Sequence, residues 1–347
     1  MTSLKLQKNI SLKPLTSFKI GGIAKYFISI KKPQDLQQTC QLAKQNKLPV
    51  FILGGGSNIL VSDQKLNALV IKLTNTDFKI EKKSTHFTYI TAGGGLNWDK
   101  LVKKTINLNL QGLECLSGIP GSVGASPTQN IGAYGQEIKD TFHHLTAYDI
   151  KTKKFTTITK KQTQFGYRDS IFKQPETKNR YIIFSVTFKL KNNHKSAINY
   201  DSLKKYLTEK KITNPSLQQI RHAVLIIRKR RLENPHINPN AGSFFKNPII
   251  NQTKLKDLQK NFPNVPHFPQ KQNQFKIPAG WLIEQAGLKG IRHKDTAISS
   301  KNALILTNPN RQSTYKQMVE LSKKTQEKVH QQFKIHLKPE VQFINFP

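Results

Sequence analysis

The sequence contains few residues suited to disulfide or metal chemistry. Only two cysteines occur among its 347 residues, Cys40 and Cys115, and they lie far apart without a CxxC pair. A disulfide framework or a structural zinc site is therefore not expected, and both side chains are predicted to be buried thiols. His143 and His144 are adjacent on a strand pattern, where neighbours point to opposite faces, which is poor geometry for a shared metal.

Acidic residues are also scarce. The chain has 20 Asp and Glu against 56 Lys and Arg, which gives a formal net charge of +36. Such a charge favours phosphate-bearing partners, and a basic nucleic-acid-binding protein is the alternative from another functional class. The lysines, however, are scattered along the whole chain, which is typical of a solvated surface. We expect no nucleic-acid partner, although the charge would attract an acidic substrate.

Long hydrophobic runs are missing as well. No apolar stretch approaches the ~20 residues of a membrane span, so we expect no membrane association and a cytoplasmic protein. Hydrophobic residues still make up 36% of the chain. That is enough to build sizeable cores, and the length allows roughly two or three domains.

Glycine-rich turns are the most conspicuous feature that is present. Residues 112–137 form a loop-rich run, and its five glycines from Gly118 to Gly135 lack the Cβ atoms that would keep successive amides from approaching one ligand. A second turn, residues 54–58, reads Gly-Gly-Gly-Ser-Asn and directly follows the apolar run 50–53. A strand that ends in this way presents backbone N–H groups to phosphate, although a ligand-free turn is the equal alternative for this motif alone.

The remaining pattern mixes strands and helices. Helical spacing covers residues 35–47, 97–106, 216–231 and 314–333, with Asn97 as a predicted helix cap. Alternating or apolar runs predict strands at residues 26–30, 50–53, 68–73, 87–92, 145–150, 155–158, 180–190, 303–306 and 334–344. The sequence therefore predicts an α+β protein.

Three residues stand out as candidates for chemistry. Ser243 lies between small and aromatic neighbours, but its context is not a GxSxG nucleophile elbow, so a turn serine is the alternative. Arg168 can fork onto a carboxylate or phosphate, or simply pair with Asp169. Glu340 follows a proline in the last strand pattern, and a half-buried carboxylate there needs a partner or a function.

Seven motifs in fixed order closely resemble the UDP-N-acetylenolpyruvoylglucosamine reductase family. They occupy residues 16–22, 54–60, 112–135, 167–173, 241–248, 279–285 and 339–344. The form of residues 167–173 and the segment around Tyr200 resemble the type of the family that has a substrate-covering tyrosine loop.

The resemblance implies a two-subdomain FAD-binding fold of the vanillyl-alcohol-oxidase kind plus a third, substrate-binding α+β domain. We place the first FAD subdomain at residues 1–75, with 337–347 returning to it, the second at 76–230 and the substrate domain at 231–336. The implied reaction reduces the enolpyruvyl ether of a UDP-sugar to UDP-N-acetylmuramate for peptidoglycan synthesis. Hydride passes from NADPH to FAD and then to the vinyl β-carbon.

The resemblance also assigns residues. Ser243 is the implied proton donor, and Arg168 and Glu340 stabilise the charge that develops on the substrate carboxylate. Substrate contacts are implied for Tyr134, Tyr200, Arg231, Asn247 and Gln285. The cofactor contacts implied are Gly54, Gly55, Gly56, Ser57, Asn58, Leu60, Ile119, Gly121, Ser122, Val123, Gly124, Ala125, Ser126, Gln129, Asn130, Gly132, Ala133 and Tyr134.

Two positions depart from the family's pattern. Arg231 stands where a lysine is expected, and Phe268 stands where a tyrosine is expected, which removes a hydroxyl from the uridine side. The main rival within enzymes is a flavin oxidase on a similar scaffold, which leaves Ser243, Asn247 and Glu340 unexplained. We expect FAD as cofactor, NADPH as reductant, no metal and a monomer.

Overall fold

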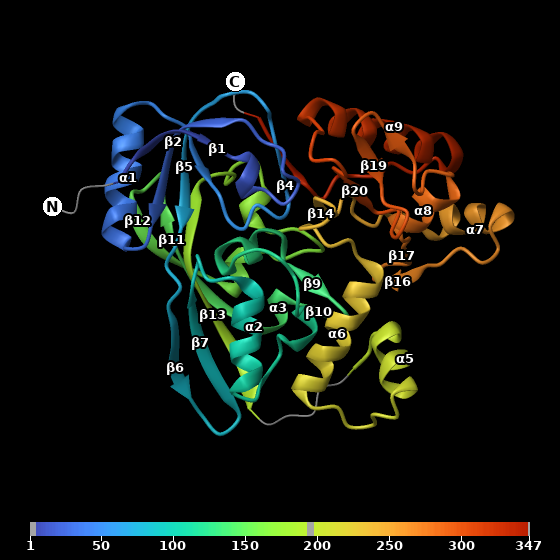
Figure 1. The fold of residues 1–347 in the computed structure, drawn as a ribbon. Coiled ribbons are helices and arrows are strands. Elements are labelled where there is room, and N and C mark those ends of the chain that lie inside the picture. The colour runs from blue at the N-terminus through green and yellow to red at the C-terminus, as the bar shows by residue number, and fades with distance from the viewer. Residues whose placement is uncertain (1–4, 193–197, 346–347) are drawn as a thin grey trace. The chain divides into compact units, whose positions relative to one another are not determined.

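The computed structural model describes residues 5–192 and 198–345. The chain divides into two compact units, and each contains segments that are distant in sequence (Figure 1). Unit 1 comprises residues 1–10, 24–56 and 67–230, and unit 2 comprises residues 11–23, 57–66 and 231–347. The division into three domains stays a prediction.

Unit 1 contains a small sheet with strand order β1-β2-β5-β3. Its elements are β1 (Gln7–Ser11), β2 (Ile23–Ile30), α1 (Pro33–Gln45), β3 (Val50–Ile52) and β5 (Leu66–Leu73). The apolar stripe of α1, which includes Leu36 and Cys40, packs on this sheet against Ile28 and Ile71. Burial raises the pKa of the Cys40 thiol to about 12, so this cysteine stays a protonated core side chain, as predicted.

A larger antiparallel sheet has the order β12-β11-β13-β7-β6, and β8 pairs with β13 outside that path. The strands are β6 (Phe78–Lys83), β7 (Phe87–Gly93), β8 (Leu110–Gln111), β11 (Phe142–Asp149), β12 (Lys154–Thr159) and β13 (Tyr181–Asn192). The predicted alternation in β13 is confirmed, because Ile182, Val186 and Phe188 are fully buried. Trp98 packs edge-on against Phe188 with ring centroids 5.9 Å apart.

Helices and short elements complete unit 1. They are α2 (Trp98–Asn107), η2 (Glu114–Leu116), η3 (Val123–Gln129), β9 (Gly132–Ala133), β10 (Gln136–Glu137), α3 (Ile138–Thr141), α4 (Lys160–Thr163), η4 (Ile171–Lys173), α5 (Asp201–Glu209) and α6 (Leu217–Arg231). Asn97 caps α2 as predicted, since its side chain accepts a hydrogen bond from the Lys100 N–H at 3.0 Å.

The expected opposition of two adjacent histidines is wrong. A β-bulge interrupts the register of β11 between Phe142 and His144. It turns the two rings toward each other, so that the Nδ1 atoms of His143 and His144 lie 2.7 Å apart. Over the residues that the structure describes, no group of three side chains could hold a metal ion.

Unit 2 is built on three short sheets. One has the order β14-β20-β19-β18, one has the order β15-β17-β16, and the third pairs β21 with β4 in parallel. The elements are η1 (Lys13–Leu15), β4 (Ile59–Val61), β14 (Asn240–Ser243), β15 (Ile249–Asn251), α7 (Gln252–Asn261), β16 (Phe268–Gln270), β17 (Gln274–Lys276), α8 (Ala279–Gln285), β18 (Arg292–His293), β19 (Thr296–Ile298), β20 (Ile305–Thr307), α9 (Tyr315–Phe333) and β21 (Gln342–Ile344).

The last strand is shorter than predicted. We expected residues 334–344 to be extended, whereas β21 covers only Gln342–Ile344. Lys334 instead has a left-handed conformation that ends α9, and Thr314 begins that helix with a capping box. Glu340 lies between the end of α9 and the start of β21, outside the strand.

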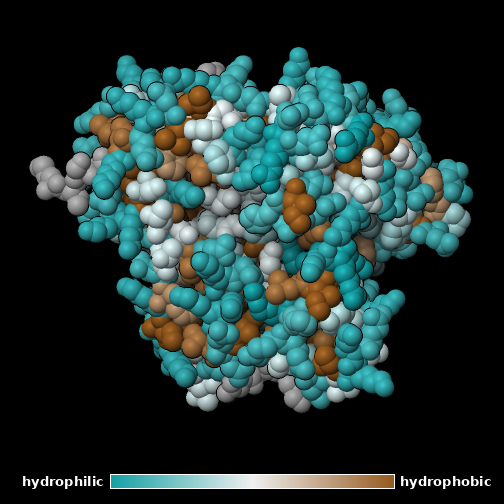
Figure 2. Space-filling view, viewed as in Figure 1, coloured by the Kyte–Doolittle hydropathy of each residue, from teal (hydrophilic) through white to brown (hydrophobic). Residues whose placement is uncertain are grey.

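Polar residues dominate the surface. Hydrophilic side chains cover most of the face in Figure 2, and hydrophobic ones form small, separate patches. Among the described residues, no helix is long and apolar enough to cross a membrane.

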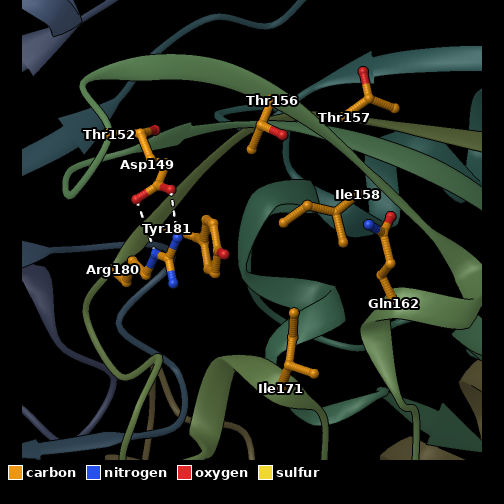
Figure 3. Close-up of a pocket in the computed structure, with 9 residues that line it drawn as sticks. All are labelled: Asp149, Thr152, Thr156, Thr157, Ile158, Gln162, Ile171, Arg180 and Tyr181. Carbon is orange, nitrogen blue, oxygen red and sulfur yellow. Dashed lines mark hydrogen bonds and ion pairs between the residues drawn. The ribbon is translucent and has the colours of Figure 1, made fainter.

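A partly buried ion pair lies where β11 ends and β13 begins. The Nε and Nη2 atoms of Arg180 donate to Asp149 at 3.0 and 2.8 Å, beside a cavity of about 300 Å³ lined by threonines and Tyr181 (Figure 3). The hydrogen bonds from Arg180 are the largest influence on the Asp149 carboxyl and help lower its pKa to about 2. The pair thus links strand β13 to the end of β11.

This ion pair makes the free energy of unfolding vary with pH in the acidic range. The folded-state pKa of Asp149 lies below the unfolded value of about 3.9, so its contribution is complete above that value and lost as pH falls through about 2. The unfolding free energies of wild type and Asp149→Asn should therefore differ by a constant amount above about pH 5 and converge toward pH 2. A difference that is unchanged at pH 2 would contradict this linkage.

Candidate active site

Two glycine-rich turns meet inside unit 1. A Cβ added to Gly55 would lie 2.5 Å from the Cα of Gly121, and one added to Gly54 would lie 2.9 Å from the Cβ of Ala125. Neither distance leaves room for a side chain. Residues 54–55 and 121–125 therefore lie side by side, as their assignment to one cofactor predicts.

A third glycine turn, residues 93–95, packs against the second one. The amides of Val123 and Gly124 donate to the carbonyls of Leu96 and Gly94, both at 2.9 Å. A Cβ on Gly124 would lie 2.8 Å from the Ile183 carbonyl oxygen of β13. These contacts seat the start of η3 against the end of β7, so the loop has a fixed position on the large sheet.

The chemistry of this region fits a pyrophosphate. Within the part of the chain that the structure describes, the backbone N–H groups of Gly54, Gly55 and Gly56 donate to no protein oxygen. The carboxylate of Glu114, within the run of residues 112–137, is fully buried and accepts hydrogen bonds from the Gly112 N–H at 2.6 Å and from the Gln136 side chain at 2.8 Å. Available donors in a cradle without side chains are what a phosphate requires.

Asn130 links the cofactor loop to the turn that carries Arg168. Its side chain is completely buried and donates to the Gly166 carbonyl at 2.9 Å and to Glu137 Oε2 at 3.0 Å. Its Oδ1 atom accepts the Lys139 N–H at 3.0 Å. The side chain that we predicted as a cofactor contact thus makes three hydrogen bonds within the protein.

Arg168 lies in a strained turn against the same loop. Its φ of +53° is in the left-handed region, and its Nη2 donates to the Gly132 carbonyl at 2.7 Å. Ser170, two residues later, donates its hydroxyl to the Thr128 carbonyl at 2.6 Å. The neighbouring Asp169 accepts a hydrogen bond from Gln174 at 3.2 Å. The guanidinium is therefore held at β9, in the loop that also carries Tyr134.

Two of the predicted substrate contacts lie together in unit 1. The rings of Tyr134 and Tyr200 meet edge to face, with centroids 5.3 Å apart and an interplanar angle of 79°. Tyr134 has a left-handed φ of +48°, whereas Tyr200 precedes α5 and is 40% exposed. The pair places an accessible phenol beside the end of the cofactor loop.

Unit 2 brings Ser243 and Glu340 to neighbouring positions. Strand β14 ends at Ser243, and the next residue, Phe244, accepts the Glu340 N–H at 2.8 Å through its carbonyl. Phe245 and Pro339 form an antiparallel bridge. The backbone segments that carry the two candidate catalytic residues therefore pair with each other in a short ladder. The Glu340 side chain is buried there, with Glu340 only 9% exposed.

Asn58, far away in sequence, forms hydrogen bonds to the Glu340 side of the same ladder. Its side chain donates to the Glu340 carbonyl at 3.3 Å, and its own carbonyl accepts the Gln342 N–H at 3.1 Å. This predicted cofactor residue thus lies next to the catalytic candidates of unit 2.

The strand that carries Ser243 is irregular just before the serine. The register with β20 shifts between Asn240 and Ser243, and Asn240 Oδ1 accepts the Gly242 N–H at 2.8 Å. Gly242 has a φ of +72°, a conformation that glycine adopts without strain. The irregularity changes the direction of the strand just before Ser243, and such bulges are common next to active sites.

The other substrate candidates lie on separate elements. Arg231 is the last residue of α6, and Gln285 is the last residue of α8. Asn247 accepts the Ala279 N–H at 2.9 Å and so holds the start of α8. Phe268, the departure from the family's tyrosine, is 45% exposed on β16.

Sequence reasoning missed Asn75, which supports the site. Asn75 is 1% exposed, donates to the Phe184 carbonyl at 2.8 Å and accepts the Gly95 N–H at 3.1 Å. It holds the third glycine turn to β13. Its contacts involve residues distant in sequence, and nothing local distinguishes it from a turn asparagine.

Comparisons with known proteins agree with this geometry. Residues 24–158 match an FAD binding domain, and residues 234–344 match the C-terminal domain of UDP-N-acetylenolpyruvoylglucosamine reductase. The chain is 40% identical over 342 residues to the reductase of Flavobacterium johnsoniae, covering 98% of this chain and 100% of the relative. It is 36% identical over 338 residues to that of Pseudomonas aeruginosa, covering 97% and 98%.

A solved structure extends the likeness to the fold. The UDP-N-acetylenolpyruvylglucosamine reductase of Thermus caldophilus aligns with a TM-score of 0.70 at 24% identity, over 99% of this chain and 100% of that one. The FAD-binding domain and the paired glycine turns define an FAD-dependent oxidoreductase of the α+β class, as predicted. The chain belongs to the UDP-N-acetylenolpyruvoylglucosamine reductase family, whose reaction serves peptidoglycan synthesis.

Proposed function

We propose that this protein oxidises NADPH and reduces the enolpyruvyl ether of UDP-N-acetylglucosamine to UDP-N-acetylmuramate. The observation that supports this most is the short ladder in unit 2 that puts Ser243 next to Glu340. A flavin oxidase has no need for a proton donor and a buried carboxylate arranged in this way.

FAD would be held by the two glycine turns. When bound, FAD would supply the hydride chemistry that couples NADPH oxidation to reduction of the substrate's vinyl β-carbon. The unpaired amides of residues 54–56 would bind the pyrophosphate, and the loop from Ile119 to Tyr134 would line the rest of the cofactor. The close approach of Gly55 to Gly121 keeps both turns in register for this role.

Arg168 and Glu340 would stabilise the charge that the reaction creates. Addition of hydride to the β-carbon builds negative charge toward the substrate carboxylate, and a cation positioned in advance stabilises that charge as it forms. Arg168 is positioned by Gly132 and by the strained turn. Glu340 would contribute to that stabilisation as a protonated carboxyl group or through a hydrogen-bond donor that bridges it to the substrate.

Ser243 would give the proton that completes the reduction. The carbon next to the site of hydride addition must be protonated from one face, and a serine hydroxyl is a weak acid, so placement has to supply its activity. The bulge formed by Asn240 and Gly242 provides such placement.

Five further residues would contact the substrate. Tyr200 would cover the substrate, and Tyr134 would contact it from the neighbouring position, since the two rings pack edge to face. Arg231, Asn247 and Gln285 would bind the nucleotide and sugar portions within the substrate domain, for which we keep residues 231–336. Phe268 would contribute contact area without the hydroxyl of a tyrosine. A monomer in the cytoplasm stays a prediction.

A single assay tests this function. The purified protein should show flavin absorbance and consume NADPH only when the enolpyruvyl UDP-sugar is present. Oxygen consumption with no need for that substrate would favour the oxidase. A colourless protein with steeply salt-dependent DNA affinity would favour the nucleic-acid-binding alternative.

Arg168→Met is expected to lower kcat by about 10²- to 10³-fold, because an oriented donor at the developing charge is lost. Steady-state kinetics with the enolpyruvyl UDP-sugar measure this effect. Arg168→Lys serves as the control, since it keeps the charge without the planar fork and should lose less. The flavin content of both variants should match wild type. Unchanged kcat in Arg168→Met would exclude this role.

A further inference from the structure

One carboxylate in unit 1 joins two helices to the cofactor loop. Asp99, near the start of α2, accepts the Gly118 N–H through Oδ1 at 2.6 Å. The Nη1 and Nη2 atoms of Arg221, on α6, donate to its two carboxylate oxygens, both at 2.6 Å. A single side chain thus fixes the turn at Gly118 relative to both helices.

The residue before Asp99 holds the same loop. The Trp98 N–H donates to the Gly121 carbonyl at 3.1 Å, and its indole Nε1 donates to the Leu116 carbonyl at 3.0 Å. The start of α2 therefore contacts the loop before, at and after Gly118. Of these contacts, only the one from Asp99 carries a charge.

A second arginine of α6 lies against the same turn. A Cβ on Gly118 would come within 3.1 Å of Arg228 Nε. Burial, the largest influence, lowers the pKa of the Arg228 guanidinium, while Tyr134 and Asp99 act in the opposite direction. An amide at position 99 would leave this desolvated cation without the charge of Asp99, so the negative charge matters as well as the shape.

The pKa of the Asp99 carboxyl is lowered by its partners. Burial is the largest single influence and by itself raises that pKa. The hydrogen bonds from Arg221 and Gly118 and the charges of Arg221 and Arg228 together outweigh it and lower the pKa of Asp99. The contribution of this group is therefore lost only as pH falls through its lowered folded-state pKa.

We propose that Asp99 is a positioning residue for FAD, which together with Arg221 fixes the Gly118 turn from which the cofactor loop begins. This inference rests on the proposed function, because the loop must bind FAD for its position to matter. Asp99 does not need to touch the cofactor. Its effect passes through the Gly118 amide and the backbone of residues 119–124.

The chain offers a matched control for this ion pair. Asp149 and Arg180 form a second two-bonded pair in unit 1, with distances of 3.0 and 2.8 Å, between strands of the large sheet. Both pairs join elements of one unit, but only the Asp99 pair binds the glycine-rich loop. A merely structural role predicts similar effects of Asp99→Asn and Asp149→Asn on flavin affinity.

The experiment measures FAD release from full-length holoenzyme on serial dilution, by the fluorescence of free flavin, alongside thermal unfolding. Asp99→Asn should bind FAD about tenfold or more weakly than wild type, the loss expected for a charge-assisted hydrogen bond. Asp149→Asn should lower the melting temperature but stay within about twofold of wild-type affinity. Arg221→Lys, which keeps the Gly118 contact and the charge, should fall between.

Each outcome decides the inference. Equal FAD affinities for Asp99→Asn and Asp149→Asn would overturn the positioning role while leaving the proposed function intact. Wild-type protein that binds no FAD would instead defeat the proposed function itself. If Asp99→Asn fails to fold, Arg221→Lys decides alone, and wild-type affinity in that variant would count against the proposal.

Discussion

Ser243→Ala is expected to slow the reduction of the enolpyruvyl substrate by about 10²- to 10⁴-fold, the range that a positioned general acid contributes. Reduction of the flavin by NADPH should be nearly unchanged, because that step needs no proton from the serine. Anaerobic stopped-flow absorbance separates the two half-reactions. The first follows bleaching of the flavin by NADPH, and the second follows its return on mixing with substrate.

A second variant sharpens this test. Ser243→Cys retains a proton donor at the same backbone position and should recover part of the lost rate, whereas a role in packing alone would not distinguish cysteine from alanine in this way. The proton-donor role is wrong if alanine slows both half-reactions equally. Equal slowing would mean that the irregular end of β14 matters for flavin binding rather than for proton transfer.

Local sequence patterns predicted much of this fold. Asn97 and Thr314 were identifiable as helix starts, because a cap acts through residues only three positions away. The glycine turns were equally visible, since contiguous glycines after an apolar run have few structural uses. The α+β class followed from such short-range signals, whereas FAD as the cofactor followed from the resemblance that the ordered motifs carry.

Contacts between distant residues were not predictable. Asp99 and Arg221 are separated by 122 positions, and Asn58 and Glu340 by 282. Each side chain alone resembles an ordinary surface residue, and only the folded backbone pairs them. The predicted length of the last strand was wrong for a related reason. The Glu340 N–H donates to the carbonyl of Phe244, a residue distant in sequence, and Glu340 lies outside the strand.

The bulge at His143 and His144 shows another limit of sequence patterns. Period-two alternation assumes an unbroken ladder, and one register shift reverses the face of every later residue. The same effect at Gly242 is productive, because it determines where Ser243 lies. Bulges depend on the partner strand, so one strand's sequence does not reveal them.

Gly55→Ala tests the meeting of the two glycine turns, the feature on which the cofactor assignment depends most. The new Cβ would lie 2.5 Å from Gly121 Cα, a backbone atom that cannot rotate away. One turn must move, which should cost about 1–3 kcal/mol of unfolding free energy. FAD should be lost on purification, because the first turn would bind the pyrophosphate and the second would line the rest of the cofactor. Chemical denaturation and the ratio of flavin to protein absorbance measure the two effects.

Gly280→Ala provides the matched control. Gly280 lies within α8, and the nearest atom to an added Cβ is Leu304 Cβ at 3.5 Å, an ordinary contact. Alanine also has a higher helix propensity than glycine, so this variant should be at least as stable as wild type and keep its flavin. Wild-type flavin content in Gly55→Ala would show that the two turns can separate without loss of the cofactor. The assignment of the pyrophosphate to the amide donors of residues 54–56 would then be wrong.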